Sequence, residues 1–208
     1  MPAQDDFVTT VDLLRHGACQ GGYIYRGRTD VELSPEGWRQ MEQAIDTSGG
    51  WQRVVTSPLL RCRIFAQHCA QQLRLPLAVI DELQEINFGA WEGQLVQDVQ
   101  QADPALLARY YEDPAAVTPP GGERTVDAQQ RMLRGWQAVL RDFAGEHLLL
   151  VCHGGVIRLL LSHLLGMPLR TSPRLYVPYA SLSRVRVYHR DGVEFPVLSS
   201  FNRRDVQQ

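Results

Sequence analysis

Five residues of the types that bind anions and transfer protons stand where the sequence pattern predicts strand ends or helix starts: Arg15, His16, Arg61, Glu85 and His153. Two guanidinium groups can hold the oxygens of a phosphoryl group through charge-assisted hydrogen bonds. Two imidazoles can change charge near neutral pH, and a carboxyl group can transfer a proton. A lone RHG tripeptide is a weak signal, but all five residues share the same expected position. Together they indicate one site for a phosphate ester.

The elements that must position these residues alternate along the chain. Short apolar runs at 8–14, 53–56 and 148–152 predict buried strands. Helices are predicted behind Ser34-Pro35 and Ser57-Pro58, from Thr125 to Phe143, and from Gly154 to Leu165. Alternation across 182–187, followed by the turn at Asp191-Gly192 into 193–201, predicts an antiparallel hairpin at the sheet edge. This order predicts an α/β fold with a mostly parallel central sheet.

Residues 86–122 break the periodic pattern. Four prolines interrupt this segment, and aromatic residues are frequent in it. We expect a helical cap, inserted into a single domain of residues 1–208, over the carboxyl edge of the sheet. Open α/β sheets bind their ligands at that edge, and long connections in compact domains tend to be lids or binding loops. An ordinary surface excursion is the alternative.

Composition excludes several classes of protein. The 208 residues are 44% hydrophobic and 21% charged, which is typical of a globular chain, and the formal net charge of −2 gives no bulk positive field for nucleic acid or an anionic membrane. The start MPAQDDF does not resemble a signal peptide, and no run reaches ~18 apolar residues. We therefore expect a cytoplasmic protein with four reduced cysteines. Neither metal-ligand spacing nor a GxxxxGK loop occurs, so no cofactor and no metal are expected.

Nearly the whole chain resembles the histidine phosphatase superfamily, which includes cofactor-dependent phosphoglycerate mutases. The resemblance rests on these residues: Arg15, His16, Gly17, Arg61, Glu85, His153 and Gly154. It implies a three-layer α/β/α sandwich and a metal-independent reaction in which His16 attacks phosphorus and water hydrolyses the phosphohistidine. It also implies that Glu85 is the acid that protonates the leaving oxygen.

The expected phosphate-binding residues are Arg15, Gly17, Arg28, Arg61, His153 and Gly154. A nucleophilic His16 must be neutral, with one ring nitrogen donating to a group that fixes the tautomer, and the Gly17 carbonyl is our candidate. Arg26 and Arg28 are either contacts to the far side of the substrate or part of a solvated loop. Glu92 is expected in a supporting or lid position.

Four longer segments are similar to bacterial α-ribazole phosphatases of the cobalamin lower-ligand pathway: GGYIYRGRTDVELSPEGW, PPGGE, VPYASLSRV and PVLSSFN. This similarity implies α-ribazole phosphate as the substrate. Four positions depart from the family pattern, because Ala18 replaces a Glu or Gln, Gly22 an Asn, Arg124 a Ser and Cys152 a Thr. Arg124 would add a cation near the entrance of the site. The expected partner is a small phosphorylated metabolite, without nucleic acid or membrane, and a homodimer is left open.

Other interpretations compete with this one. Cys152 to Arg158 fits C-x5-R, the loop of cysteine-dependent phosphatases, with the thiol at a helix N-terminus. That interpretation leaves four residues unexplained: Arg15, His16, Arg61 and Glu85. A non-catalytic phosphate-binding module has no need of all five site residues. Among enzymes, a broad phosphatase of sugar phosphates or other small phosphate esters is the main alternative, and a mutase is disfavoured because the chain lacks room for the extra loops of larger mutases.

Overall fold

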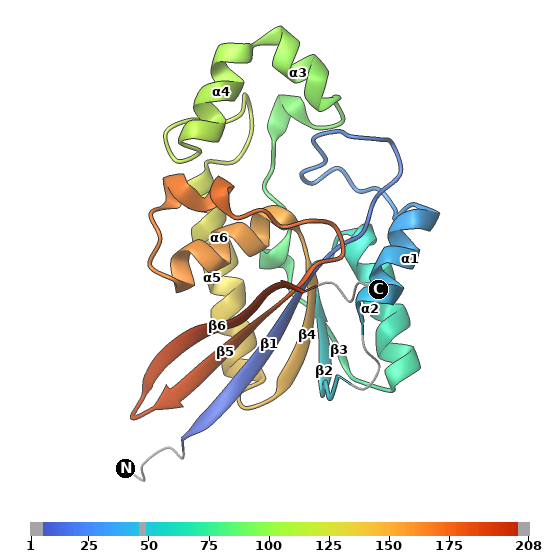
Figure 1. Cartoon of the computed structure of the whole chain (residues 1–208), viewed down its shortest axis with the longest axis vertical. Helices are drawn as coiled ribbons and strands as arrows, with labels where there is room; N and C mark the ends of the chain where they lie inside the picture. The colour runs from blue at the N-terminus through green and yellow to red at the C-terminus, as the bar shows by residue number, and fades with distance from the viewer. Residues whose placement is uncertain (1–5, 46–48, 204–208) are drawn as a thin grey trace.

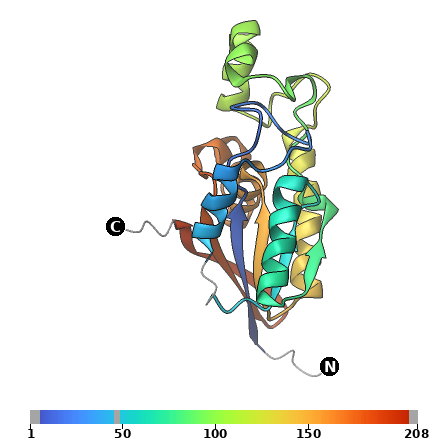
Figure 2. The same cartoon turned by 90° about the vertical axis from the view of Figure 1, so that its right-hand side faces the viewer.

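The computed structural model describes residues 6–45 and 49–203, and all structural statements below concern these residues. Residues 1–5, part of the start that predicts no leader peptide, lie outside the described residues. The predicted α/β fold is confirmed: one six-stranded sheet is covered by helices on both faces (Figures 1 and 2). No helix in the described part is long and apolar enough to cross a membrane.

The sheet has the strand order β3-β2-β4-β1-β5-β6. Its strands are β1 (Phe7–Arg15), β2 (Arg53–Thr56), β3 (Leu77–Val79), β4 (His147–Cys152), β5 (Leu182–Arg190) and β6 (Val193–Arg203). The first four strands pair in parallel, whereas β5 runs antiparallel to β1 and β6 antiparallel to β5. The predicted hairpin at the sheet edge is therefore confirmed. The short strand β3 was not expected, because its three residues give too little periodicity to separate from the preceding helix.

Six α-helices complete the layers: α1 (Pro35–Ala44), α2 (Leu60–Leu73), α3 (Val96–Ala102), α4 (Pro104–Glu112), α5 (Thr125–Asp142) and α6 (Gly154–Leu164). Three short 3-10 helices join them: η1 (Asp81–Leu83), η2 (Gly89–Trp91) and η3 (Leu169–Arg174). Strand β4 shows how the layers are built, since its side chains alternate between two cores. Leu148 and Leu150 pack with α5 and α6, whereas Leu149 and Val151 pack with α1 and α2. Each such fully buried leucine contributes ~2 kcal/mol of hydrophobic stabilisation.

Helix α2 begins later than predicted. Its first residue is Leu60, and Leu59 at the N-cap makes no side-chain hydrogen bond. The Ser57 hydroxyl, expected to cap this helix, instead lies 2.7 Å from Nε2 of His153. The Leu60 amide is capped from outside the helix by the carboxylate of Asp30, at 2.7 Å. The serine expected to cap the helix thus contacts a histidine of the site.

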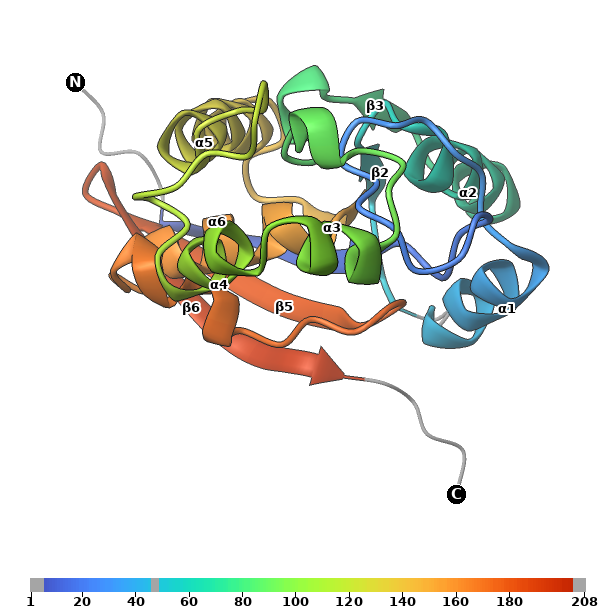
Figure 3. The same ribbon diagram turned by 90° about the horizontal axis from the view of Figure 1, so that it is seen from above.

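The segment 86–122, here called the cap, contains η2, α3 and α4. Figure 1 shows α3 and α4 beyond the ends of the parallel strands, and Figure 3 shows them above the sheet. The cap has a small core of its own, formed with one residue from an earlier loop: Tyr25, Trp91, Val99, Leu107, Tyr110 and Val117. Most aromatic residues that made this segment conspicuous in the sequence therefore pack against one another.

Candidate active site

The two histidines of the site come together because β1 and β4 are parallel neighbours. Arg15, the last residue of β1, pairs with Cys152, the last residue of β4. His16 and His153 therefore follow at the same edge, and their ring centroids lie 5.3 Å apart. The backbone amide of His16 donates to the Cys152 carbonyl at 2.9 Å, which holds this edge together.

His16 has the tautomer that a nucleophile requires. Its Nδ1 lies 2.8 Å from the Gly17 carbonyl oxygen, and a carbonyl can only accept, so Nδ1 carries the proton and Nε2 keeps its lone pair. Burial, reinforced by the positive charges of Arg61 and Arg15, holds the pKa of His16 well below its usual range. The imidazole is thus neutral at working pH. This partner is the carbonyl anticipated from the sequence.

His153 is completely buried beside His16. Its Nε2 lies 2.7 Å from the Ser57 hydroxyl, and both ring nitrogens lie 3.7 Å from the Cys62 sulfur. Burial first, and then the charge of Arg61, holds the pKa of His153 well below its usual range. The two imidazoles are therefore both neutral in the cluster that they share with the two arginines.

Arg15 and Arg61 are fixed by backbone carbonyls rather than by carboxylates. Arg15 donates to the Val177 carbonyl at 2.5 Å, and its guanidinium lies 4.1 Å from the centre of the Tyr179 ring. Arg61 donates to the carbonyls of Gly27 and Thr29 at 2.6 and 3.0 Å. These contacts orient both side chains and leave their positive charges uncompensated.

The Nε atoms of Arg15 and Arg61 are buried and have no acceptor among the described residues. Leaving a buried donor unpaired costs ~1–3 kcal/mol, and more for a charged group. A bound anion at this point would supply the missing acceptors. The pair of orphaned guanidinium donors is therefore a geometric sign of an anion site.

Glu85 is held against the start of α6. One carboxylate oxygen accepts the Ile86 amide and the other accepts the Gly155 amide, each at 3.0 Å. A Cβ at position 155 would lie 2.2 Å from Oε1 of Glu85, so only glycine leaves room for the carboxyl group there. A Cβ at Gly154 would lie 3.1 Å from Nε of Arg15. The two glycines after His153 thus shape the site.

A cavity of about 510 Å³ opens between the cap and the edge of the sheet. Five of the predicted site residues line it: Arg15, His16, Arg61, Glu85 and Gly154. Gly17 and His153 lie behind its wall in contact with His16. Arg28 was predicted to bind phosphate, but it lies outside the lining and its guanidinium is 3.4 Å from the carboxylate of Glu123. Arg124 is paired with Asp127 on the surface, at 3.8 Å.

Arg26, which the sequence offered as a contact to the far side of the substrate or as part of a solvated loop, lines the cavity; it is buried and donates to loop carbonyls. Other lining residues were not identified from the sequence as parts of the site. Arg158 donates through Nε to the Leu175 carbonyl at 2.9 Å. A wall of aromatic rings is formed mainly by Tyr23, Tyr25, Phe88, Tyr110, Tyr111, Tyr176 and Tyr179. The VPYASLSRV segment carried a signal for Tyr179, but the rest come from loops without a local pattern.

Glu92 supports the site from the base of the cap. Its carboxylate accepts the backbone amides of Arg28 and Thr29, at 2.9 and 2.7 Å, and that of Phe88 at 3.0 Å. The loop that it holds carries the two carbonyls bound to Arg61. Glu92 therefore occupies the supporting position that was expected of it.

The C-x5-R interpretation is wrong for this chain. Cys152 is fully buried at the end of β4, and it lies in the core shared with α5 and α6. Burial raises the pKa of its thiol, the opposite of what a thiolate nucleophile needs. All four cysteines are free and buried.

Comparison with known proteins identifies the class. Residues 11–197 match the model of the histidine phosphatase superfamily (branch 1). The chain belongs to this superfamily.

Individual relatives differ in what they act on. The chain is 36% identical over 189 residues to the bifunctional protein Rv2228c of Mycobacterium tuberculosis, a match that covers 88% of this chain and 51% of that protein. It thus spans about half the length of this relative. It is 31% identical over 161 residues to the adenosylcobalamin/alpha-ribazole phosphatase of Escherichia coli, covering 75% of this chain and 79% of the other.

Among solved structures, that of the mycobacterial glucosyl-3-phosphoglycerate phosphatase Rv2419c superposes with a TM-score of 0.81 at 26% identity. The superposition covers 94% of this chain and 99% of that one.

Proposed function

We propose that the chain is a metal-independent phosphomonoesterase that works through a phosphohistidine on His16. The observation that carries the proposal is the neutral, Nδ1-protonated imidazole of His16 in a cavity lined also by Arg15 and Arg61, whose buried Nε donors have no acceptor among the described residues. Arginine donors bind the phosphoryl oxygens, and their charge stabilises the transition state, because phosphoryl transfer depends mainly on positioning and electrostatics.

In the first step, Nε2 of His16 forms a bond to phosphorus while the bond from phosphorus to the ester oxygen breaks. Glu85, in its protonated form, gives its proton to the leaving oxygen, which departs as an alcohol. Arg15, Arg61 and His153 hold the three phosphoryl oxygens during the transfer. The Gly154 amide at the start of α6 adds a donor on the same side.

In the second step, water attacks phosphorus and the N–P bond breaks. Glu85, now a carboxylate, accepts the proton of the water molecule. The products are inorganic phosphate and neutral His16, so the cycle returns to its starting state without a redox partner or a metal.

For the natural substrate we propose α-ribazole phosphate. Support comes from the 31% identity to the E. coli adenosylcobalamin/alpha-ribazole phosphatase and from the tyrosine-rich cavity wall, which suits a flat aromatic leaving group. The cytoplasmic location expected from the sequence stays a prediction, and whether the chain forms a homodimer stays open.

A second candidate is a small phosphate ester that carries a carboxylate near its phosphate. Arg158 favours it, because this half-buried cation lines the cavity and is bound through Nε to a carbonyl rather than to a carboxylate. The likeness to a glucosyl-3-phosphoglycerate phosphatase agrees with such a substrate.

Two measurements test the proposal. The kcat/KM values for α-ribazole phosphate, 3-phosphoglycerate esters and simple sugar phosphates, each with and without EDTA, identify the substrate class and the need for metal. We expect the highest value with α-ribazole phosphate and no effect of EDTA. Rapid acid-sensitive quenching followed by mass spectrometry should find phosphate on His16 and none in a His16→Ala variant. Phosphate on another residue, or activity that is lost to EDTA and restored by Mg²⁺, would refute the mechanism.

A further inference from the structure

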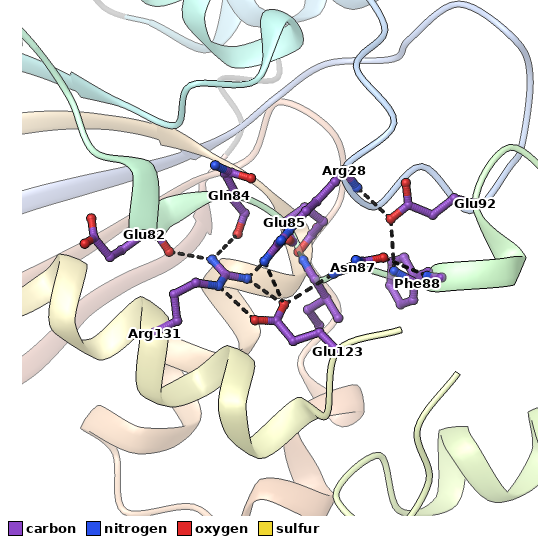
Figure 4. Close-up of polar contacts among 11 residues, drawn as sticks. Arg28, Glu82, Gln84, Glu85, Asn87, Phe88, Glu92, Glu123 and Arg131 are labelled. Atoms are coloured by element: carbon purple, nitrogen blue, oxygen red, sulfur yellow. Dashed lines mark hydrogen bonds and ion pairs between the residues drawn. The ribbon is translucent and has the colours of Figure 1, made fainter. Parts of the chain in front are cut away.

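A half-buried ion pair, Arg131 with Glu123, lies directly behind Glu85 and contacts the backbone of this residue (Figure 4). Arg131, on α5, donates to the carbonyls of Glu82 and Gln84 at 2.6 and 3.0 Å, and to that of Glu85 at 3.3 Å. These carbonyls belong to the end of η1 and the residues after it, where a short helix leaves acceptors without intrahelical donors. Arg131 therefore ties down the segment that carries the proposed acid.

Glu123 orients Arg131. Its two carboxylate oxygens receive Nε and Nη2 of Arg131 at 2.9 and 2.8 Å, which is a bidentate pair. Burial alone would raise the pKa of Glu123, but the hydrogen bonds and charge of Arg131 outweigh it and lower the pKa. Glu123 is thus ionised at neutral pH, and the planar guanidinium is held in one orientation.

The same pair joins the two ends of the cap. Glu123 follows the cap directly, and its backbone amide donates to the Asn87 carbonyl at 2.8 Å. Its carboxylate also accepts the Asn87 amide and one Nη of Arg28, each at 3.4 Å. Figure 4 shows these contacts converging from α5, the loop around 28 and the segment 82–88. The position of the cap and the position of Glu85 are therefore fixed through one pair of side chains.

Close packing of α5 on η1 makes this reach feasible. Gly135 lies one turn after Arg131, and a Cβ there would be 2.8 Å from the Cβ of Glu82. Without a side chain at 135, α5 approaches η1 closely enough for Arg131 to reach three carbonyl acceptors within residues 82–85.

We propose that Arg131, oriented by Glu123, is a positioning residue for proton transfer by Glu85. The proposal rests on the acid role given to Glu85 above. The Glu85 carboxyl group is fixed on one side by the Gly155 amide, and its backbone is fixed on the other side by Arg131. Loss of the second anchor lets the acid shift relative to the leaving oxygen, whereas His16 and the phosphate-binding arginines keep their own supports.

The test uses two substrates that differ in their need for an acid. Ribose 5-phosphate has a leaving oxygen of high pKa, whereas the leaving group of p-nitrophenyl phosphate hardly needs a proton. We compare kcat/KM, which reports on the steps up to phosphoryl transfer. We expect Arg131→Met to lower kcat/KM for ribose 5-phosphate about 10-fold, the scale of a small displacement of a catalytic group. The value for p-nitrophenyl phosphate should change much less.

Three further variants make the result specific. Glu123→Gln, which keeps the side-chain shape, should cause the same selective loss to a smaller degree, and it carries the test if Arg131→Met does not fold. Arg134→Met, an exposed arginine on the same helix, should behave like the wild type. In a Glu85→Gln background, Arg131→Met should cause no further loss of kcat/KM for ribose 5-phosphate, because the acid that Arg131 positions is already absent.

Equal losses on both substrates, or losses that add to those of Glu85→Gln, would make the ion pair merely structural and overturn the proposal. The Glu85→Gln single variant distinguishes failure of the positioning role of Arg131 from failure of the acid role of Glu85. A Glu85→Gln loss confined to ribose 5-phosphate, together with an unselective Arg131→Met loss, would refute only the positioning role. If Glu85→Gln lowers kcat/KM equally for both substrates, the acid role of Glu85 itself is wrong.

Discussion

At the scale of single residues, the reactivity of His16 depends on a short contact within its own turn. The Gly17 carbonyl accepts a hydrogen bond from Nδ1–H, and burial beside Arg61 and Arg15 keeps the ring neutral. A charged imidazole would have no lone pair for phosphorus. The residue that attacks is therefore prepared by its neighbours before any substrate arrives.

Imidazole NMR should observe this state directly in the free protein. With ¹⁵N-labelled histidine, we expect the His16 signals to show the Nδ1–H tautomer and to remain those of a neutral ring at pH 6, because the pKa in the folded protein lies well below 6.5. His153 should also stay neutral at that pH, for the same reason. Free histidine in the same buffer is the control. A His16 ring that is half protonated near pH 6.5 would contradict the assignment.

Sequence reasoning reached the residues whose chemistry is local and missed those whose role depends on the fold. The Gly17 carbonyl could be named because it is one residue from His16, and Arg15, Arg61, Glu85 and His153 could be named because each has a distinctive motif. Arg131 and Gly155 could not, since what they contact lies 46 and 70 residues away in the sequence. The pairing of Arg28 with Glu123 could not be foreseen, because nothing near Arg28 in the chain indicates that partner.

At the scale of elements, the two adjacent glycines at the N-terminus of α6 make room for different residues of the site. A Cβ at Gly154 would meet Arg15 at 3.1 Å, a tight contact, whereas a Cβ at Gly155 would meet Glu85 at 2.2 Å, which leaves no room for a side chain. The helix itself was predictable from its apolar run and the glycine that ends it. The start of α2 was not, because Ser57 looks like a helix cap in sequence but is 2.7 Å from His153 in space.

Alanine at each of the two glycines should give different defects. Gly155→Ala places a methyl group on the Glu85 carboxyl, so kcat/KM for ribose 5-phosphate should fall at least about 10-fold while p-nitrophenyl phosphate is affected much less. Gly154→Ala places a methyl group against Arg15, so kcat/KM should fall to a similar degree for both substrates. Neither variant should lower the melting temperature much, because alanine favours a helix by ~1 kcal/mol over glycine. Identical substrate profiles for the two variants would contradict this division.

At the scale of the whole molecule, the residues of the active site and a buried network that stabilises the fold lie at different positions along the strands of the same sheet. The edge that carries the histidines is polar and open to the cavity, whereas lower in the sheet Asp12 forms a separate buried network. Asp12 accepts two hydrogen bonds from Arg184, at 2.7 and 2.8 Å, one from Trp51 at 2.8 Å, and lies 3.0 Å from Nε2 of His147. This single carboxylate thus links β1, β4, β5 and the segment before β2.

Asp12→Asn should therefore destabilise the fold without changing the active site. Burial alone would raise the pKa of Asp12, but the hydrogen bonds from Arg184, His147 and Trp51 outweigh it and lower the pKa far below its ordinary value. Removing one partner of such a buried network costs about 3 kcal/mol. We expect a loss of that order in the free energy of unfolding by urea at pH 7, with kcat/KM near the wild-type value below the melting temperature. Glu36→Gln, in an exposed ion pair with Arg39, is the matched control and should have little effect.

The contribution of Asp12 to the free energy of unfolding should also depend on pH. Because the pKa of Asp12 is lower in the folded than in the unfolded protein, its contribution to stability is complete above the unfolded value of about 3.9 and declines as the pH falls toward the folded value. The difference in free energy of unfolding between wild type and Asp12→Asn should therefore shrink as the pH falls below about 4. Unfolding curves at several pH values measure it. A difference that stays the same at pH 3.5 as at pH 7 would mean that packing of the side chain, rather than its negative charge, holds these strands together.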